Sequence, residues 1–166
     1  FNPAAGSLNT ASTVGRNYDP SFAWEDLDRI RQIWPGKLIV KGVVHPADAE
    51  RVVQMGADAI IVSNHGGRQL DTGPATLDAL PAVKSAVGDR IQVLLDGGIR
   101  RGSDIMKALA LGADAVLLGR ATLYGLAGAG EHGVDRAMTI LKQELTRTMQ
   151  LCGVNRIDEI NRDYLM

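Results

Sequence analysis

Short apolar runs recur along the chain, and a helical pattern separates each run from the next. The runs are KLIVKGV, DAIIVS, IQVLLDGG and DAVLLGR, at residues 37–43, 58–63, 91–98 and 114–120. They are apolar throughout and do not alternate with polar residues, which is typical of parallel strands that are buried on both faces. The sequence therefore predicts an α/β fold with about four β/α units.

A weak internal repeat supports this organisation. MGADAIIVS at residues 55–63 resembles LGADAVLLG at residues 111–119, and in both a glycine ends a helix and an aspartate precedes a strand. Ser103 is the expected N-cap of the fourth helix. The expected helices cover about 22–34, 46–55, 74–87, 101–111 and 131–151, with a short helical piece over 121–130.

Composition excludes several classes of function. The 166 residues carry 18 basic and 19 acidic side chains, so there is no basic field for nucleic acid. Cys152 is the only cysteine, and no two histidines have metal-ligand spacing, so neither a disulfide nor a metal is predicted. Residues 1–20 are rich in Gly, Ser, Asn, Thr and Pro and are predicted to be loop, which leaves 21–166 as the folded part.

Four β/α units are half of an eight-unit barrel, and a small doubly wound domain is the alternative. The positions of the polar residues favour the barrel. They fall at the carboxyl ends of the predicted strands, which is the face that carries the chemistry in β/α barrels. The residues at these ends are Lys41, Ser63-Asn64-His65, Asp96-Gly97-Gly98 and Gly119-Arg120.

The last two predicted strands end in DGGIRRG and GRATLYG. In barrels, the corresponding loops commonly hold a phosphate with the help of a short helix. The glycines Gly97, Gly98 and Gly119 allow the backbone to approach an anion, and Arg100 and Arg120 offer forked donors to phosphate oxygens. The alternative is that both arginines are ordinary surface residues.

The second strand leads directly into a histidine and an arginine. Histidine suits a general base near neutral pH, so His65 is a candidate for that role, and Arg68 can grip a carboxylate with two donors. Lys41 is expected to point into the site and Asp96 to accept from ligand hydroxyls. The alternatives are a loop histidine with a rim arginine, a rim salt bridge for Lys41 and a helix cap for Asp96.

Four ordered motifs carry a family resemblance. The chain resembles the FMN-dependent α-hydroxy acid dehydrogenases and oxidases of the glycolate oxidase and mandelate dehydrogenase type, which fold as TIM (β/α)8 barrels. The matching motifs are VKG, SNHGGRQLD, DGGIRRGSD and LGRATLYGLA, at residues 40–42, 63–71, 96–104 and 118–127.

The resemblance implies FMN-dependent oxidation of an (S)-2-hydroxy acid to the 2-oxo acid. His65 would remove a proton from the substrate and Arg68 would bind its carboxylate. The implied FMN contacts are Lys41 at the N1 edge, Ser63 at the ring, Asp96 along the ribityl chain, and Gly98, Arg100, Gly119 and Arg120 at the phosphate, with Gly97 as a further cofactor-binding residue.

The resemblance also implies that residues 21–166 are the C-terminal half of the barrel and 1–20 a loop remnant. The expected partners are the N-terminal half of the same enzyme, a small 2-hydroxy acid, and further copies in a homo-oligomer, a tetramer. The expected location is the cytoplasm or the cytoplasmic membrane face. Two alternatives stay open: a non-redox phosphate-binding barrel lyase or isomerase, and an inactive half-barrel fragment.

Overall fold

The computed structural model describes residues 19–165, so most of the predicted N-terminal loop at 1–20 lies outside the described residues. The chain divides into two compact units, Phe1–Pro35 and Gly36–Met166. The described part of the first unit contains helix α2 (Trp24–Ile33). Its N-cap is Ala23, whose backbone N–H donates to the Asp26 carboxylate at 2.9 Å.

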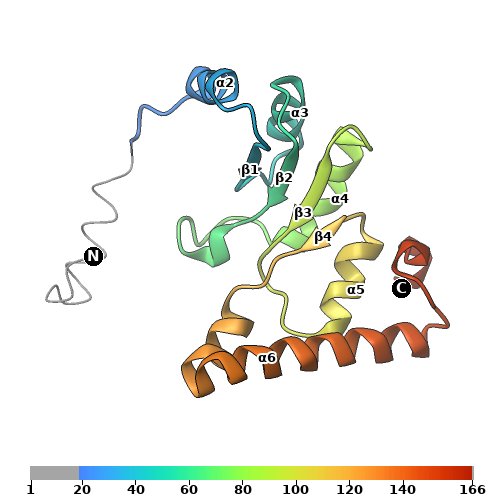
Figure 1. Cartoon of the computed structure of the whole chain (residues 1–166). Coiled ribbons are helices and arrows are strands. Elements are labelled where there is room, and N and C mark those ends of the chain that lie inside the picture. Colours follow the sequence, from blue (N-terminus) through green and yellow to red (C-terminus); the bar gives the residue numbers. More distant parts are fainter. Residues whose placement is uncertain (1–18, 166) are drawn as a thin grey trace, which may run out of the picture. The chain divides into compact units, whose positions relative to one another are not determined.

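The second unit is built on a parallel sheet. Its strands are β1 (Ile39–Lys41), β2 (Ala59–Val62), β3 (Gln92–Leu95) and β4 (Ala115–Val116), in the order β1-β2-β3-β4 (Figure 1). Each new strand is added on the same side of the sheet. This order has no reversal of the kind that defines a doubly wound sheet, and it is the order of a β/α barrel.

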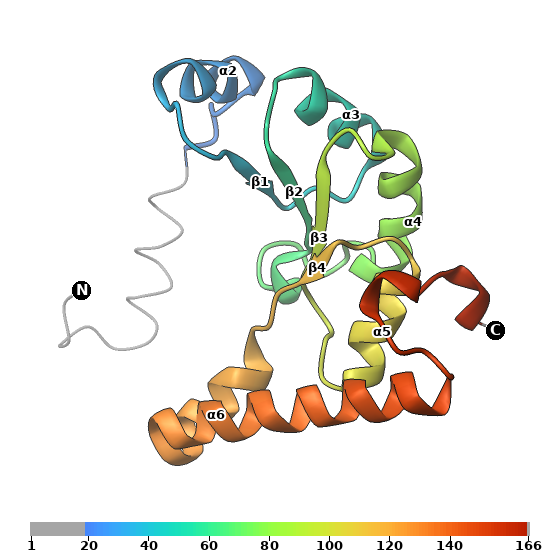
Figure 2. The same ribbon diagram turned by 45° about the vertical axis from the view of Figure 1, so that its right-hand side comes forward.

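Three helices cover one face of the sheet (Figures 1 and 2). They are α3 (Pro46–Gln54), α4 (Thr76–Val87) and α5 (Gly102–Ala110). Side chains alternate between the two faces of a strand, and the alternate positions of β2 and β3 that form the core are fully buried. These are Ile60, Val62, Val93 and Leu95, each 0% exposed.

Burial on both faces was predicted for all the strands, but it holds only for β2. The two edge strands, β1 and β4, are partly exposed, and Ile39 at the start of β1 is 49% exposed. Both are also shorter than the predicted runs at 37–43 and 114–120. Within residues 19–165 each edge strand pairs with a neighbour on one side only, so fewer ladder hydrogen bonds define its length.

The internal repeat is a real structural unit. In each copy a glycine in the left-handed region ends the helix, at Gly56 and Gly112. In each copy the aspartate accepts a hydrogen bond from the backbone of the preceding strand region. Asp58 accepts from Leu38 N, just before β1, at 2.8 Å, and Asp114 accepts from Val93 N of β3 at 2.7 Å. The same joint therefore fixes two neighbouring pairs of strands.

The last helix, α6 (Arg120–Leu151), consists of two pieces. Residues 120–128 and 131–151 are helical, and Ala129 and Gly130 between them are not. At Gly125 and Gly133 the two pieces approach so closely that a Cβ on either glycine would overlap the backbone of the other. The predicted short piece followed by a long helix is confirmed.

The C-terminal tail packs back against α5. It contains two short 3-10 helices, η2 (Ile157–Glu159) and η3 (Arg162–Tyr164). A small apolar cluster joins the tail to α5, and its buried members are Met106, Ala110, Val154 and Ile160.

The start of α5 differs from the prediction. Its N-cap is Arg101 and not Ser103, and Asp104 accepts the Arg101 backbone N–H at 2.9 Å. Gly102, the first helical residue, is buried against α6, where a Cβ would overlap the backbone of Glu144 and Leu145. The helix therefore begins where a carboxylate is available and where no side chain fits.

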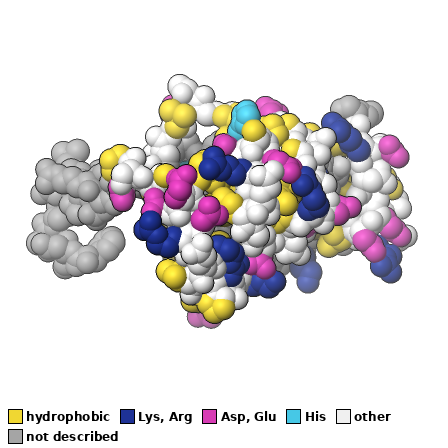
Figure 3. Space-filling view, turned by 90° about the horizontal axis from the view of Figure 1, so that it is seen from above, with side chains coloured by type: hydrophobic (Ala, Val, Ile, Leu, Met, Phe, Trp, Pro, Cys, Tyr) yellow, Lys and Arg dark blue, Asp and Glu magenta, His cyan; other side chains and the backbone are white. Residues whose placement is uncertain are grey.

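The surface carries both signs of charge. On the face shown in Figure 3, acidic and basic side chains are interspersed among hydrophobic ones, with no extended field of one sign. Among the described residues, no helix has both the length and the apolar character that would let it cross a membrane.

Gly102→Ala in a full-length protein that carries these residues should destabilise it by about 1–3 kcal/mol, because the added methyl overlaps backbone that cannot move away. Gly128→Ala is the control, since nothing lies within 4 Å of a Cβ at Gly128. The measurement is the midpoint of thermal unfolding of both variants. Equal midpoints for the two variants would contradict the tight contact between α5 and α6.

Candidate active site

The carboxyl ends of the strands meet at one edge of the sheet. Lys41 is the last residue of β1, and Ser63 and Asp96 directly follow β2 and β3. The register pairs Lys41 with Ile61, two residues before Ser63, and the backbone N–H of Asp96 continues the β2–β3 ladder. Because side chains alternate along a strand, Lys41, Ser63 and Asp96 project from the same face, opposite to the covering helices.

A chain of polar contacts links these three side chains to the next loop. Lys41 Nζ donates to Ser63 Oγ at 2.8 Å and lies 2.8 Å from Asp96 Oδ2. The Ser63 hydroxyl oxygen also accepts from the backbone N–H of His65 at 3.1 Å, and Ser63 is only 1% exposed. Lys41 thus forms an ion pair, and its partner is another predicted site residue.

One carboxylate oxygen of Asp96 accepts no hydrogen bond from the described residues. Its Oδ1 atom is buried and has no hydrogen-bond partner among the described residues, whereas Oδ2 pairs with Lys41. An unsatisfied buried acceptor costs about 1–3 kcal/mol, which indicates a donor supplied from elsewhere. The alternative role of Asp96 as the cap of α5 is not observed, because the N-cap is Arg101 and the carboxylate of Asp104 accepts its backbone N–H.

The loop after β2 is held in an unusual conformation. His65, Gly66 and Gly67 form the 3-10 helix η1, and all three have positive φ, of 55°, 69° and 72°. Asn64 holds the loop: its Oδ1 accepts from Gly66 N at 3.0 Å, and its Nδ2 donates to the carbonyl of Pro74 at 3.2 Å. A non-glycine residue in the left-handed region is uncommon, and such strain is concentrated at functional sites.

The two side chains predicted to bind substrate are both exposed at this edge. The His65 ring lies against Gly42, where a Cβ would stand 2.7 Å from His65 Cε1. Arg68 follows η1, and within residues 19–165 its guanidinium forms no hydrogen bond or ion pair. The loop therefore presents an imidazole and a free guanidinium.

The two arginines of the predicted phosphate loops come from neighbouring strands. Arg120 begins α6 after β4, and its guanidinium lies 3.4 Å from where a Cβ of Gly66 would stand. Arg100 follows the Gly97–Gly98 turn after β3, in which both glycines have positive φ. Neither guanidinium has a partner in the part of the chain that the structure describes, so both are available to a ligand.

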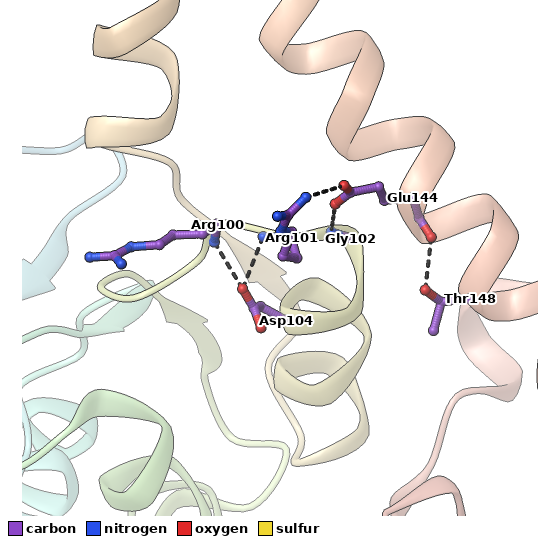
Figure 4. A network of polar contacts seen from close by, with 6 residues as sticks. All are labelled: Arg100, Arg101, Gly102, Asp104, Glu144 and Thr148. Atoms are coloured by element: carbon purple, nitrogen blue, oxygen red, sulfur yellow. Dashed lines mark hydrogen bonds and ion pairs between the residues drawn. The ribbon is translucent and has the colours of Figure 1, made fainter.

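The starts of α5 and α6 differ in how far their first backbone N–H groups are already bonded. The first backbone N–H groups of α5 are already bonded to the carboxylates of Asp104 and Glu144 (Figure 4). At α6, whose N-cap is Gly119, the N–H groups of Arg120 and Ala121 donate to no described residue. Free N–H groups at the positive end of a helix favour an anion. Within residues 19–165 no group of His, Cys, Asp or Glu could hold a metal ion.

A family model described as FMN-dependent dehydrogenase matches residues 3–166. The chain belongs to the FMN-dependent dehydrogenase family. Membership implies FMN as the cofactor.

Relatives agree with this assignment. An L-lactate dehydrogenase of Yersinia pestis (strain Pestoides F) is 51% identical over 152 residues, which are 92% of this chain and 40% of that enzyme. The crystal structure of the monotopic membrane protein (S)-mandelate dehydrogenase is 48% identical with a TM-score of 0.89, over 100% of this chain and 44% of that one. A structure of mandelate oxidase with (S)-2-phenylpropionate is 40% identical with a TM-score of 0.81, over 85% and 42%.

These likenesses confirm the predicted fold, the C-terminal part of a TIM (β/α)8 barrel. The chain spans less than half the length of the relatives that it matches. The remaining β/α units of the barrel in those relatives therefore lie outside the matched segment.

The described residues fit FMN. The buried, unpartnered Oδ1 of Asp96 is an acceptor suited to a ribityl hydroxyl. The unpaired guanidinium groups of Arg100 and Arg120, with the open start of α6, form a donor set suited to a phosphate. A Cβ at Gly98 or Gly119 would meet nothing within 4 Å, so open space adjoins both backbones.

Three residues that shape the site were given no role from the sequence. Asn64 was placed at the end of the second strand, and an asparagine two residues before a glycine often bonds back to the loop. Thr76 is 3% exposed and donates to the carbonyl of Gly97 at 3.3 Å, which fixes the turn after β3. Glu144 accepts a hydrogen bond from Gly102, which lies 42 residues away in the sequence, and no local pattern predicts such a contact.

Gly42→Ala should displace the His65 ring, because the added methyl would stand 2.7 Å from Cε1. Gly56→Ala is the matched control: Gly56 also has positive φ, but nothing lies within 4 Å of its Cβ. In a full-length protein, the imidazole resonances of His65 in NMR spectra should shift in the first variant only. Unchanged resonances in Gly42→Ala would contradict the contact.

Proposed function

We propose that the enzyme containing these residues oxidises an (S)-2-hydroxy acid to the 2-oxo acid with bound FMN. The observation that carries the proposal is the polar cluster of Lys41, Ser63 and Asp96, joined through Ser63 to the His65 loop. The names of the relatives, L-lactate dehydrogenase and (S)-mandelate dehydrogenase, support a small 2-hydroxy acid as substrate.

Bound FMN supplies a two-electron acceptor, and the chain's residues hold it in place. Arg100, Arg120 and the start of α6 would hold the phosphate, and Asp96 Oδ1 would accept from the ribityl chain. The Lys41 ammonium, fixed by Ser63 and Asp96, would place a positive charge beside the ring. Ser63 is buried, so it would act on the ring indirectly. It would do so by holding Lys41 and the backbone of its own loop in place.

His65 and Arg68 would act on the substrate. Oxidation removes two electrons and two protons from the hydroxy acid, and an imidazole nitrogen of His65 would take one of those protons as general base. The Arg68 guanidinium would bind the carboxylate with two parallel hydrogen bonds and so direct the α-carbon toward His65. A base beside a carboxylate clamp suits chemistry at the carbon next to the carboxylate.

We further propose that the open edges β1 and β4 pair with strands from the N-terminal half of the same enzyme. Each edge strand has a partner on one side only, and a closed barrel needs eight strands. We also propose assembly into a homo-oligomer, a tetramer, on the ground of the family resemblance alone. For location we propose the cytoplasm or the cytoplasmic membrane face, because one related structure is a monotopic membrane protein.

His65→Ala in the full-length enzyme should slow flavin reduction by about 10²–10⁴-fold, the usual contribution of a general base. FMN should stay bound, because none of the proposed FMN contacts is changed. His132→Ala, an exposed histidine of α6, is the control. Stopped-flow absorbance of the flavin under anaerobic conditions gives the rate. Reduction at the normal rate in His65→Ala would refute the assignment, and a purified wild type without flavin absorbance would favour a non-redox lyase or isomerase.

Arg68→Lys should raise KM for the hydroxy acid by about tenfold, because an ammonium cannot form the bidentate pair. The exposed Arg136→Lys serves as control. Steady-state kinetics should be repeated with the methyl ester of the same substrate, whose carboxylate is masked. The variant and the wild type should then have similar KM values, and an equal loss with acid and ester would argue against a carboxylate clamp.

A further inference from the structure

Helix α5 begins directly on the long piece of α6. Glu144 of α6 accepts from the backbone N–H of Gly102 at 2.9 Å and from Arg101 Nη1 at 2.9 Å (Figure 4). A Cβ at Gly102 would overlap the backbone of Leu145, so only glycine allows this approach. One carboxylate therefore fixes both the backbone and the side chain at the start of α5.

Glu144 is held as an anion. Its pKa lies below the usual value of a glutamate, chiefly because the Gly102 N–H donates to the carboxylate and secondly because Arg101 does. Its side chain is 26% exposed. On the next turn, the Thr148 hydroxyl donates to the carbonyl of Glu144 at 2.8 Å. The proposed catalytic roles do not use this carboxylate.

The contact separates two adjacent arginines. Asp104 accepts from the backbone N–H groups of both Arg100 and Arg101, at 3.0 Å and 2.9 Å. The Arg101 guanidinium turns to Glu144, whereas the Arg100 side chain points away from both carboxylates (Figure 4). Glu144 thus engages the guanidinium of Arg101, whereas that of Arg100 has no partner within residues 19–165.

We propose that Glu144 is a positioning residue for the phosphate of the cofactor. By holding Gly102 and Arg101 on α6, it fixes the backbone from which Arg100 reaches the ligand. Arg120 begins the short piece of α6, and that piece packs on the long piece, which carries Glu144, at Gly125 and Gly133. The two pieces of α6 therefore connect Glu144 to both phosphate-binding arginines. The inference rests on the FMN site proposed above, and it concerns only the phosphate end of that site.

The test compares FMN with riboflavin, which lacks the phosphate. Both ligands are titrated into the apoprotein of the full-length enzyme, and flavin fluorescence reports binding. Glu144→Gln should weaken FMN binding by about tenfold, the effect expected when one charge-assisted hydrogen bond is lost. Riboflavin binding should change by less than about twofold. Asp135→Asn, an exposed carboxylate on the same helix, should alter neither affinity.

The outcomes are distinct. Equal weakening of FMN and riboflavin would show that Glu144 only supports the fold, and unchanged FMN affinity would refute any role in binding. If the wild type binds FMN no more tightly than riboflavin, the proposed phosphate site itself is refuted. If Glu144→Gln does not fold, Glu144→Asp keeps the charge but shortens the side chain, and the same selective loss for FMN is required of it.

Discussion

The parallel register of β1–β4 is the constraint on which the site depends. Because the four strands run the same way and are added in order, side chains that are far apart in sequence emerge at one edge of the sheet. The helices bury the opposite face through Ile60, Val62, Val93 and Leu95, and this leaves the site face free for polar groups. The repeated Asp58 and Asp114 joints fix the register from the other end of the strands. Placement of the site is thus a consequence of core packing.

Electrostatics then limits what this edge can bind. A partly buried ion pair such as Lys41 and Asp96 gains little stability by itself, since removing both charges from water offsets their attraction. The Ser63 hydroxyl partly compensates Lys41, but Asp96 Oδ1 stays unpaired within the described residues. The nearby guanidinium groups of Arg68, Arg100 and Arg120 have no counterion there either. The cluster therefore favours an anionic ligand that also brings hydroxyl donors.

Much of this arrangement could be predicted from the sequence, because it depends on local patterns. The apolar runs, the glycine–aspartate joints and the polar residues after each strand indicated both the fold and the edge where Lys41 and Asp96 meet. The lengths of β1 and β4 could not be predicted, because within the described residues each of these strands pairs on one side only. The prediction that Ser103 caps α5 was wrong. Serine is a favoured N-cap residue, but in the structure the carboxylates of Asp104 and the distant Glu144 accept the backbone N–H groups at the start of α5. Contacts across long stretches of sequence leave no local pattern.

The two glycine–arginine loops look alike in sequence but differ in physical character. At α5 the helix start carries two carboxylates, so an anion there would have to displace Asp104 and Glu144 and lose the hydrogen bonds they make. At α6 the N–H groups of Arg120 and Ala121 are open, and the helix dipole adds to the charge of Arg120. Arg100 can contribute only through its side chain. We infer that a phosphate at this edge would be held by backbone on the α6 side and by the Arg100 guanidinium on the α5 side, so the placement of Arg100 depends on the backbone that Asp104 and Glu144 fix.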